Sequence, residues 1–307
     1  MKEALRYAGV IAGDKVLLPS FICRDLLSCV AELGAETIFY NVNQKLEPVD
    51  LDSTVMAKVV VAVNYFGFPQ NLEPFQKYSQ LTNAKIIEDN AHGFLSRDDE
   101  KILLGSRTNF GITSFRKSLR VQDGAILTTS LSDLEIDKQL VQLDVRQSSR
   151  SKVLAAIANL ETNSKIPLTL IGQLVSRTLR FLKSGSTLPR PDPSAEMIIP
   201  IPANPHKESI KRLQAVDEIQ EVKRRRELYK KLAPKAVATG AKLIFDELPQ
   251  NTCPYGVPVF ATDHQRTKLA KVARKNRVTL MRWPELPMGV VETAPDFYHQ
   301  VCLLNFR

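Results

Sequence analysis

The first half of the chain alternates between short apolar runs and longer segments whose hydrophobic side chains recur at helical spacing. This pattern predicts strands at residues 16–19, 36–42, 59–63 and 85–88, with helices at residues 25–33 and 72–81. The run 59–63 is wholly apolar and mostly β-branched, which is typical of a strand buried on both faces. The alternation therefore predicts a three-layer α/β/α fold, in which helices cover both faces of a parallel sheet.

The pattern changes after residue 129. Helical spacing predicts helices at residues 131–143, 152–160 and 168–183, and residues 184–205 are rich in proline, serine and glycine. The last third predicts a long helix at residues 209–233, strands at 254–260 and 278–283, and a helix at 263–275. We expect a large α/β domain at residues 1–183, a linker at residues 184–205 and a small α+β domain at residues 206–307.

Composition indicates an ordinary globular chain. Its 307 residues, 44% of them hydrophobic, can bury one large core or two smaller ones. No run approaches the ~18 consecutive apolar residues that span a membrane, and the first residues lack a signal-peptide pattern. We therefore expect a cytoplasmic protein that does not bind a membrane. Its four cysteines show neither metal-ligand spacing nor the density of a disulfide scaffold, so we expect reduced thiols and no metal.

The formal charge of +9 raises the question of a nucleic-acid partner. The basic residues are scattered, however, and the one dense run, residues 223–226, lies within a helical pattern. We interpret that run as a solvated helix face in preference to an anion site. No nucleic-acid-binding motif accompanies the charge, so we expect no nucleic-acid partner. A basic surface also suits an anionic small-molecule substrate.

Candidate chemistry follows two of the apolar runs. Asp89 and His92 come at the end of the run 85–88, and Ser114 and Lys117 follow the apolar residues at 111–112. An Asp-Gly pair then opens a further predicted strand at residues 125–129. Because ligands of open α/β sheets gather at the carboxyl ends of strands, these side chains are expected to meet in one crevice.

Each of these four residues also has an ordinary structural explanation. Lys117 could be a surface lysine in a turn, and Asp89 could cap a helix that follows its strand. His92 could be a buried histidine with a satisfied hydrogen bond, and Ser114 could cap the next turn. The residue types alone leave these alternatives open.

The order of motifs resembles a known family. Ile-Glu-Asp-x-Ala-His-Gly at residues 87–93, Ser-Phe-x-Lys-x-Leu at 114–119 and Asp-Gly at 123–124 resemble the pyridoxal-phosphate-dependent nucleotide-sugar aminotransferases called the DegT/StrS family. Two upstream motifs, at residues 13–20 and 63–69, also resemble those of the family. The resemblance covers about the first half of the chain, with the motifs in the family's order.

This resemblance implies the type I fold of pyridoxal-phosphate-dependent transferases. It implies that Lys117 is the Schiff-base lysine and the proton carrier, and that Asp89 pairs with the pyridine nitrogen of pyridoxal 5'-phosphate. It also implies that His92 lies near the phenolic oxygen of the cofactor and that Ser114 binds its phosphate. The expected reaction is amination of a keto-sugar nucleotide, with glutamate or glutamine as amino donor, in a homodimer.

Some residues depart from the family pattern. Cys23 lies where many members carry an aromatic that stacks on the cofactor, and Asn64 replaces a histidine. Both ends of the chain also look short against the family. These departures support an alternative, a truncated or degenerate member without turnover that acts as a binding or interaction protein.

Overall fold

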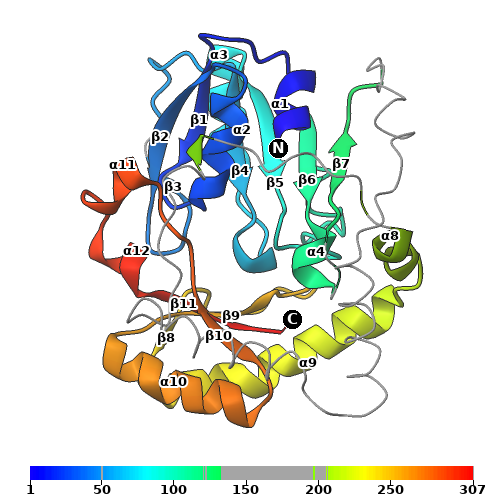
Figure 1. Ribbon diagram of the computed structural model, residues 1–307, viewed down its shortest axis with the longest axis vertical. Coiled ribbons are helices and arrows are strands. Elements are labelled where there is room, and N and C mark those ends of the chain that lie inside the picture. Colours follow the sequence, from blue (N-terminus) through cyan, green and yellow to red (C-terminus); the bar gives the residue numbers. More distant parts are fainter. Residues whose placement is uncertain are drawn as a thin grey trace, which may run out of the picture.

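The computed structural model describes residues 1–49, 51–119, 121, 123–132, 196–197, 205 and 207–306. The helices expected at 131–143, 152–160 and 168–183 lie outside these residues, apart from Leu131 and Ser132. The expected linker 184–205 also lies outside them, apart from Glu196, Met197 and Pro205. The described residues form two β-sheets with helices packed against them (Figure 1).

The larger sheet has seven strands in the order β3-β2-β1-β4-β5-β6-β7. They are β1 (Lys15–Pro19), β2 (Glu36–Val42), β3 (Pro48–Val49), β4 (Val59–Val63), β5 (Lys85–Asp89), β6 (Phe110–Thr113) and β7 (Ile126–Thr129). The five central strands are parallel, and the edge strands β3 and β7 are antiparallel to their neighbours. All five residues of β4 are buried, as its apolar composition predicts for a central strand. The α/β prediction is confirmed.

The helical segments of the first half are short. They are α1 (Lys2–Tyr7), η1 (Arg24–Leu26), α2 (Leu27–Ala31), η2 (Tyr65–Gly67), α3 (Glu73–Thr82) and α4 (Phe115–Ser118). The helix expected at 25–33 is therefore a 3₁₀ turn followed by a five-residue α-helix. α3 ends at Asn83, which has φ +58° and adopts the left-handed conformation that commonly terminates helices.

The second sheet has four antiparallel strands in the order β10-β11-β9-β8. They are β8 (Lys242–Leu243), β9 (Gly256–Phe260), β10 (Thr279–Arg282) and β11 (Val301–Asn305). Its helices are α8 (Lys207–Gln214), α9 (Glu218–Val237), α10 (Asp263–Lys275), α11 (Met288–Val291) and α12 (Asp296–Gln300). β11 is buried at every position and lies between β10 and β9, so the last described residues complete the middle of this sheet.

Two expectations for α9 are corrected. The single helix expected at 209–233 is divided into α8 and α9, because Asp217 adopts an extended conformation and its side chain accepts a hydrogen bond from the Gln220 backbone N–H. The basic run 223–226 is only partly a solvated face. Arg225 is 1% exposed, because successive residues of a helix point in different directions and Arg225 faces inward.

The two sheets meet at the carboxyl ends of the parallel strands. Figure 1 shows the second sheet on the side of the larger sheet where α4 lies. Buried side chains of both sheets belong to one hydrophobic cluster. Trp283, which follows β10, packs edge-on against Phe21, Tyr65 and Phe66 of the larger unit. None of the helices within the described ranges is long and apolar enough to cross a membrane.

Candidate active site

Lys117 and His92 are in contact. Lys117 lies on α4, which begins directly after β6, and His92 lies in the turn that follows β5. The Nζ atom of Lys117 is 3.4 Å from the Nε2 atom of His92. Since β5 and β6 are adjacent parallel strands, both side chains lie at the carboxyl ends of these strands.

A glycine fixes the position of α4. The ring of Phe115, the first residue of α4, is 2% exposed and packs over Gly124. A Cβ atom on residue 124 would lie 1.8 Å from Cζ of Phe115, so a larger side chain there would force the Phe115 ring or the backbone to shift. The carbonyl of Gly124 also accepts a hydrogen bond from the Arg116 N–H at 3.3 Å. The Asp-Gly motif thus has a packing role beside Lys117.

His92 is packed among aromatic rings. It is 4% exposed and stacks on Tyr255, with ring centroids 4.7 Å apart, and on Phe66, with centroids 5.7 Å apart. The edge of Trp283 closes a third side at 5.1 Å. Burial, and secondarily the charge of Lys117, hold the pKa of His92 well below its usual value. The imidazole is therefore neutral near pH 7, so one of its two ring nitrogens can accept a hydrogen bond.

Asp89 ends β5 and is 7% exposed. Its Oδ1 atom accepts a hydrogen bond from the Ala91 N–H at 2.9 Å. A turn follows this residue, so Asp89 does not cap a helix as the structural alternative supposed. The pairing of Asp89 with Ile112 of β6 places the carboxylate on the strand beside the one that leads into α4.

Ser114 occupies the position before α4 in an extended conformation. Its side chain makes no capping hydrogen bond to α4, which contradicts the capping alternative. Its carbonyl accepts a hydrogen bond from the Lys117 N–H at 3.2 Å. The half-buried hydroxyl of Ser114 therefore lies about one helical turn from Lys117 and does not cap α4.

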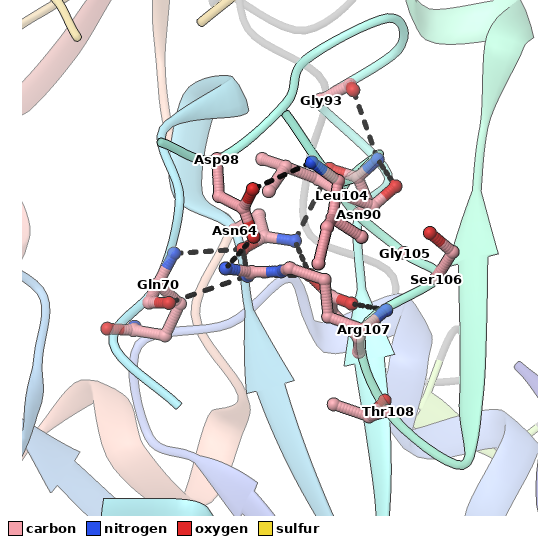
Figure 2. A network of polar contacts seen from close by, with 12 residues as sticks. Asn64, Gln70, Asn90, Gly93, Asp98, Leu104, Gly105, Ser106, Arg107 and Thr108 are labelled. Carbon is pink, nitrogen blue, oxygen red and sulfur yellow. Dashed lines mark hydrogen bonds and ion pairs between the residues drawn. The ribbon is translucent and has the colours of Figure 1, made fainter. Parts of the chain in front are cut away.

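A buried ion pair lies near the carboxyl end of β5. Glu88 is fully buried and pairs with Arg107, whose Nε donates to its Oε1 at 2.8 Å and whose backbone N–H donates to its Oε2 at 3.1 Å. Asn64 Nδ2 donates to the same Oε1 at 2.7 Å, and Asn64 Oδ1 accepts from Arg107 Nη2 at 3.0 Å. Figure 2 shows the side chains of Asn64 and Arg107 together beside the backbone of Gln70, whose N–H donates to Asn64 Oδ1 and whose carbonyl accepts from Arg107 Nη2. This network joins the ends of β4 and β5 to the loop that follows His92.

The network explains the departure at residue 64. The Asn64 side chain is engaged with Glu88 and Arg107, and its backbone N–H donates to the Asp89 carbonyl at 2.9 Å. Neither Glu88 nor Arg107 was predicted from the sequence as part of the site. The one available signal was a carboxylate inside an apolar strand, which requires a partner when it is buried.

Cys23 lies near Lys117. Burial is the main cause that raises the pKa of its thiol, and the charge of Lys117 acts weakly in the opposite direction. The thiol is therefore neutral at pH 7. All four cysteines are free thiols, and the described part of the chain contains no group of three or more histidine, cysteine or carboxylate side chains suited to a metal ion.

Comparison with solved structures defines the fold class. A DegT/DnrJ/EryC1/StrS aminotransferase from Brucella abortus is 16% identical, with a TM-score of 0.61, over 99% of this chain and 77% of that chain. The aminotransferase TlmJ from Streptoalloteichus hindustanus is 19% identical, with a TM-score of 0.57, and the match covers 99% of this chain and 77% of that chain. DesI, solved in the presence of its TDP-sugar product, is 15% identical, with a TM-score of 0.60, and the match covers 99% of this chain and 73% of that chain. The fold is therefore that of the type I pyridoxal-phosphate-dependent aminotransferases.

The family follows from the sequence comparison. Residues 1–167 match the model of the DegT/DnrJ/EryC1/StrS aminotransferase family, more than half of the chain. The chain belongs to this family. The resemblance found in the motifs is confirmed, and so is the expectation of an aminotransferase at the level of the family.

Proposed function

We propose that the protein binds pyridoxal 5'-phosphate and transfers an amino group from glutamate or glutamine to the keto carbon of a nucleotide sugar. The observation that carries this proposal is the contact between the Lys117 amine and the buried, neutral His92 at the strand edge where Asp89 ends β5. When bound, pyridoxal phosphate supplies an aldehyde that takes up an amine and a ring that withdraws electrons from the neighbouring carbon.

The residues present fit this cofactor. A carboxylate at a buried strand end is costly without a partner, and a protonated pyridine nitrogen is such a partner for Asp89. The hydroxyl of Ser114 does not cap α4, and it is proposed to donate a hydrogen bond to the phosphate. His92 is proposed to bind the phenolic oxygen. These three side chains and Lys117 come from two adjacent strand ends.

Lys117 is proposed to have two tasks. Its Nζ atom would hold the aldehyde carbon of the cofactor and, once displaced by a substrate amine, would move a proton between the substrate and the cofactor. The Nε2 atom of His92 lies 3.4 Å from this nitrogen, and the neutral imidazole is proposed to orient it through this contact. Since His92 carries no charge near pH 7, it places no second cation beside the lysine.

The substrate class is inferred from charge and from one structural neighbour. The net charge of +9 favours anionic ligands, and DesI was solved with a TDP-sugar. A keto-sugar nucleotide and an amino-acid donor are therefore the proposed substrates, in place of nucleic acid or membrane. The proposal includes a homodimer in the cytoplasm, and light scattering of the purified protein tests the dimer.

Covalent trapping tests the role of Lys117. The protein is incubated with pyridoxal phosphate and reduced with borohydride, and the labelled peptide is identified by mass spectrometry. We expect the label on Lys117, none in Lys117→Ala, and full labelling in Lys101→Ala, which removes an exposed lysine from another loop. Labelling spread over surface lysines, and unchanged in Lys117→Ala, refutes the assignment.

The alternative is a family member that binds ligands without turnover. Cys23, which cannot stack on a cofactor ring, and Asn64, which is engaged in the buried network, are the residues that favour it. Cofactor bound at Lys117 without amino transfer from glutamate or glutamine to any of a panel of keto-sugar nucleotides would support this reading.

A further inference from the structure

Arg225 is a buried cation, and each of its three side-chain nitrogen atoms donates a hydrogen bond. It belongs to α9 and is 1% exposed. Its Nε donates to Glu221 Oε1 at 2.6 Å, its Nη2 to the Ser118 carbonyl at 2.7 Å and its Nη1 to the Pro254 carbonyl at 3.4 Å. Burying a guanidinium is costly unless its donors are satisfied, so these bonds determine where the side chain can lie.

The shortest of the two carbonyl contacts is to the helix of Lys117. Ser118 is the last residue of α4 and directly follows Lys117. A helix of four residues is not stable by itself, and its last carbonyls have no partners within the helix. The guanidinium satisfies one of them with a charge-assisted hydrogen bond. The position of α4 therefore depends on a side chain 107 residues away in the sequence.

The second carbonyl contact leads to His92. Pro254 immediately precedes Tyr255, whose ring stacks on His92 at 4.7 Å. The Tyr255 N–H donates to the Phe66 carbonyl at 2.8 Å, and the Phe66 ring also stacks on His92. One guanidinium thus joins the helix that carries Lys117 to the segment that holds His92.

We propose that Arg225 is a positioning residue that keeps the Lys117 amine against His92. This inference rests on the proposed role of Lys117 as the residue that holds the cofactor. Arg225 fixes both sides of the 3.4 Å contact between Nζ and Nε2, so its loss lets α4 move relative to the His92 stack. Through this residue, α9 and the second sheet are coupled to the geometry of the site.

The neighbouring arginine provides a matched control. Arg226 lies on the same helix and its Nη1 donates to two backbone carbonyls, those of Pro249 at 2.6 Å and Thr252 at 2.8 Å. Neither carbonyl belongs to α4. Arg225→Gln and Arg226→Gln therefore both remove hydrogen bonds from the same helix to backbone carbonyls, and only the first releases the helix of Lys117. Arg225→Gln also removes the ion pair with Glu221, which lies within α9 itself.

The first measurement uses the protein without cofactor. Hydrogen exchange of a peptide covering residues 114–119 is followed by mass spectrometry. We expect exchange to be about tenfold faster in Arg225→Gln, the effect of losing one hydrogen bond to a charged group, and unchanged in Arg226→Gln. Faster exchange of this peptide to the same extent in both variants overturns the proposal, because it indicates general destabilisation.

The second measurement uses the protein with cofactor. The rate of covalent attachment of pyridoxal phosphate to Lys117 is expected to fall about tenfold or more in Arg225→Gln, with Arg226→Gln close to wild type. Arg225→Lys keeps a cation but loses the forked geometry, so it is expected to recover part of the rate and keeps the test valid if the glutamine variant does not fold. Equal rates in all three variants overturn the proposal. Absence of attachment in wild type instead refutes the proposed function, while hydrogen exchange still tests the role of Arg225 in holding α4.

Discussion

Replacing Gly124 by alanine should displace the helix that carries Lys117. The new Cβ atom would lie 1.8 Å from Cζ of Phe115, far inside van der Waals contact. Phe115 cannot simply turn away, because its ring is packed against Phe94 and Val121 in a small buried cluster. Overpacking of this kind costs about 1–3 kcal/mol. The left-handed backbone at φ +116° adds about 1–2 kcal/mol for any residue with a Cβ atom.

A second glycine separates these two effects. Gly13 has φ +84°, and a Cβ atom there would meet nothing within 4 Å. Gly13→Ala should therefore show the backbone cost alone, about 1–2 kcal/mol by urea unfolding. Gly124→Ala should cost about 2–5 kcal/mol and should also slow attachment of pyridoxal phosphate to Lys117, since a displacement of ~1 Å can lower a rate ~100-fold.

A compensating substitution tests the clash itself. Phe115→Leu in the Gly124→Ala background shortens the side chain that the new methyl group meets, so it should recover part of the lost stability and of the attachment rate. If Gly124→Ala costs no more than Gly13→Ala and attaches cofactor at the wild-type rate, the packing of Phe115 on residue 124 does not position Lys117.

Three further outcomes are expected. Because the pKa of His92 is lower in the folded than in the unfolded protein, where it is about 6.5, the free energy of unfolding should fall as the pH drops below that value, by up to about 1.4 kcal/mol per pH unit. His92→Gln should therefore reduce the pH dependence of the free energy of unfolding, measured in urea between pH 7 and 5. An unchanged slope would contradict this. Arg107→Met leaves Glu88 buried without its cation and should lower the free energy of unfolding by about 3–5 kcal/mol, and adding Glu88→Gln should restore part of that loss. Equal stability of the single and double variants would show that the unpaired Glu88 charge is not the cause. Asp89→Asn should leave the melting temperature near wild type while lowering amino transfer with the cofactor bound, and retention of full activity would exclude the proposed pairing with the pyridine nitrogen.

Local patterns predicted the central sheet because each strand carries its own signal. The run 59–63 has no polar side chain for either face, so only a strand covered on both sides accommodates it. The last apolar run, which forms β11, was not assigned. A short apolar run fits a strand or a buried helix equally well, and its place between β10 and β9 depends on partners elsewhere in the chain.

The candidate site was partly predictable for a related reason. Asp89 ends one strand and Lys117 follows another, and the order of their motifs indicated both the family and the carboxyl ends of the strands as the place of the site. The stacking of His92 with Phe66 and Tyr255 was not predictable, because Tyr255 lies far away in the sequence, directly before β9 of the second sheet. The neutrality of His92 follows from this burial and not from its neighbours in sequence.

The alternation of strands and helices, the family and the candidate chemical residues could be predicted from the amino-acid sequence, since they depend on side-chain type and on spacing along the chain. The pairs of groups that meet became visible only in the folded chain: Glu88 with Arg107, Lys117 with His92, and Arg225 with the carbonyl of Ser118. Such pairs join distant segments, and a hydrogen bond or a buried charge depends on distance in space, which the order of residues does not contain.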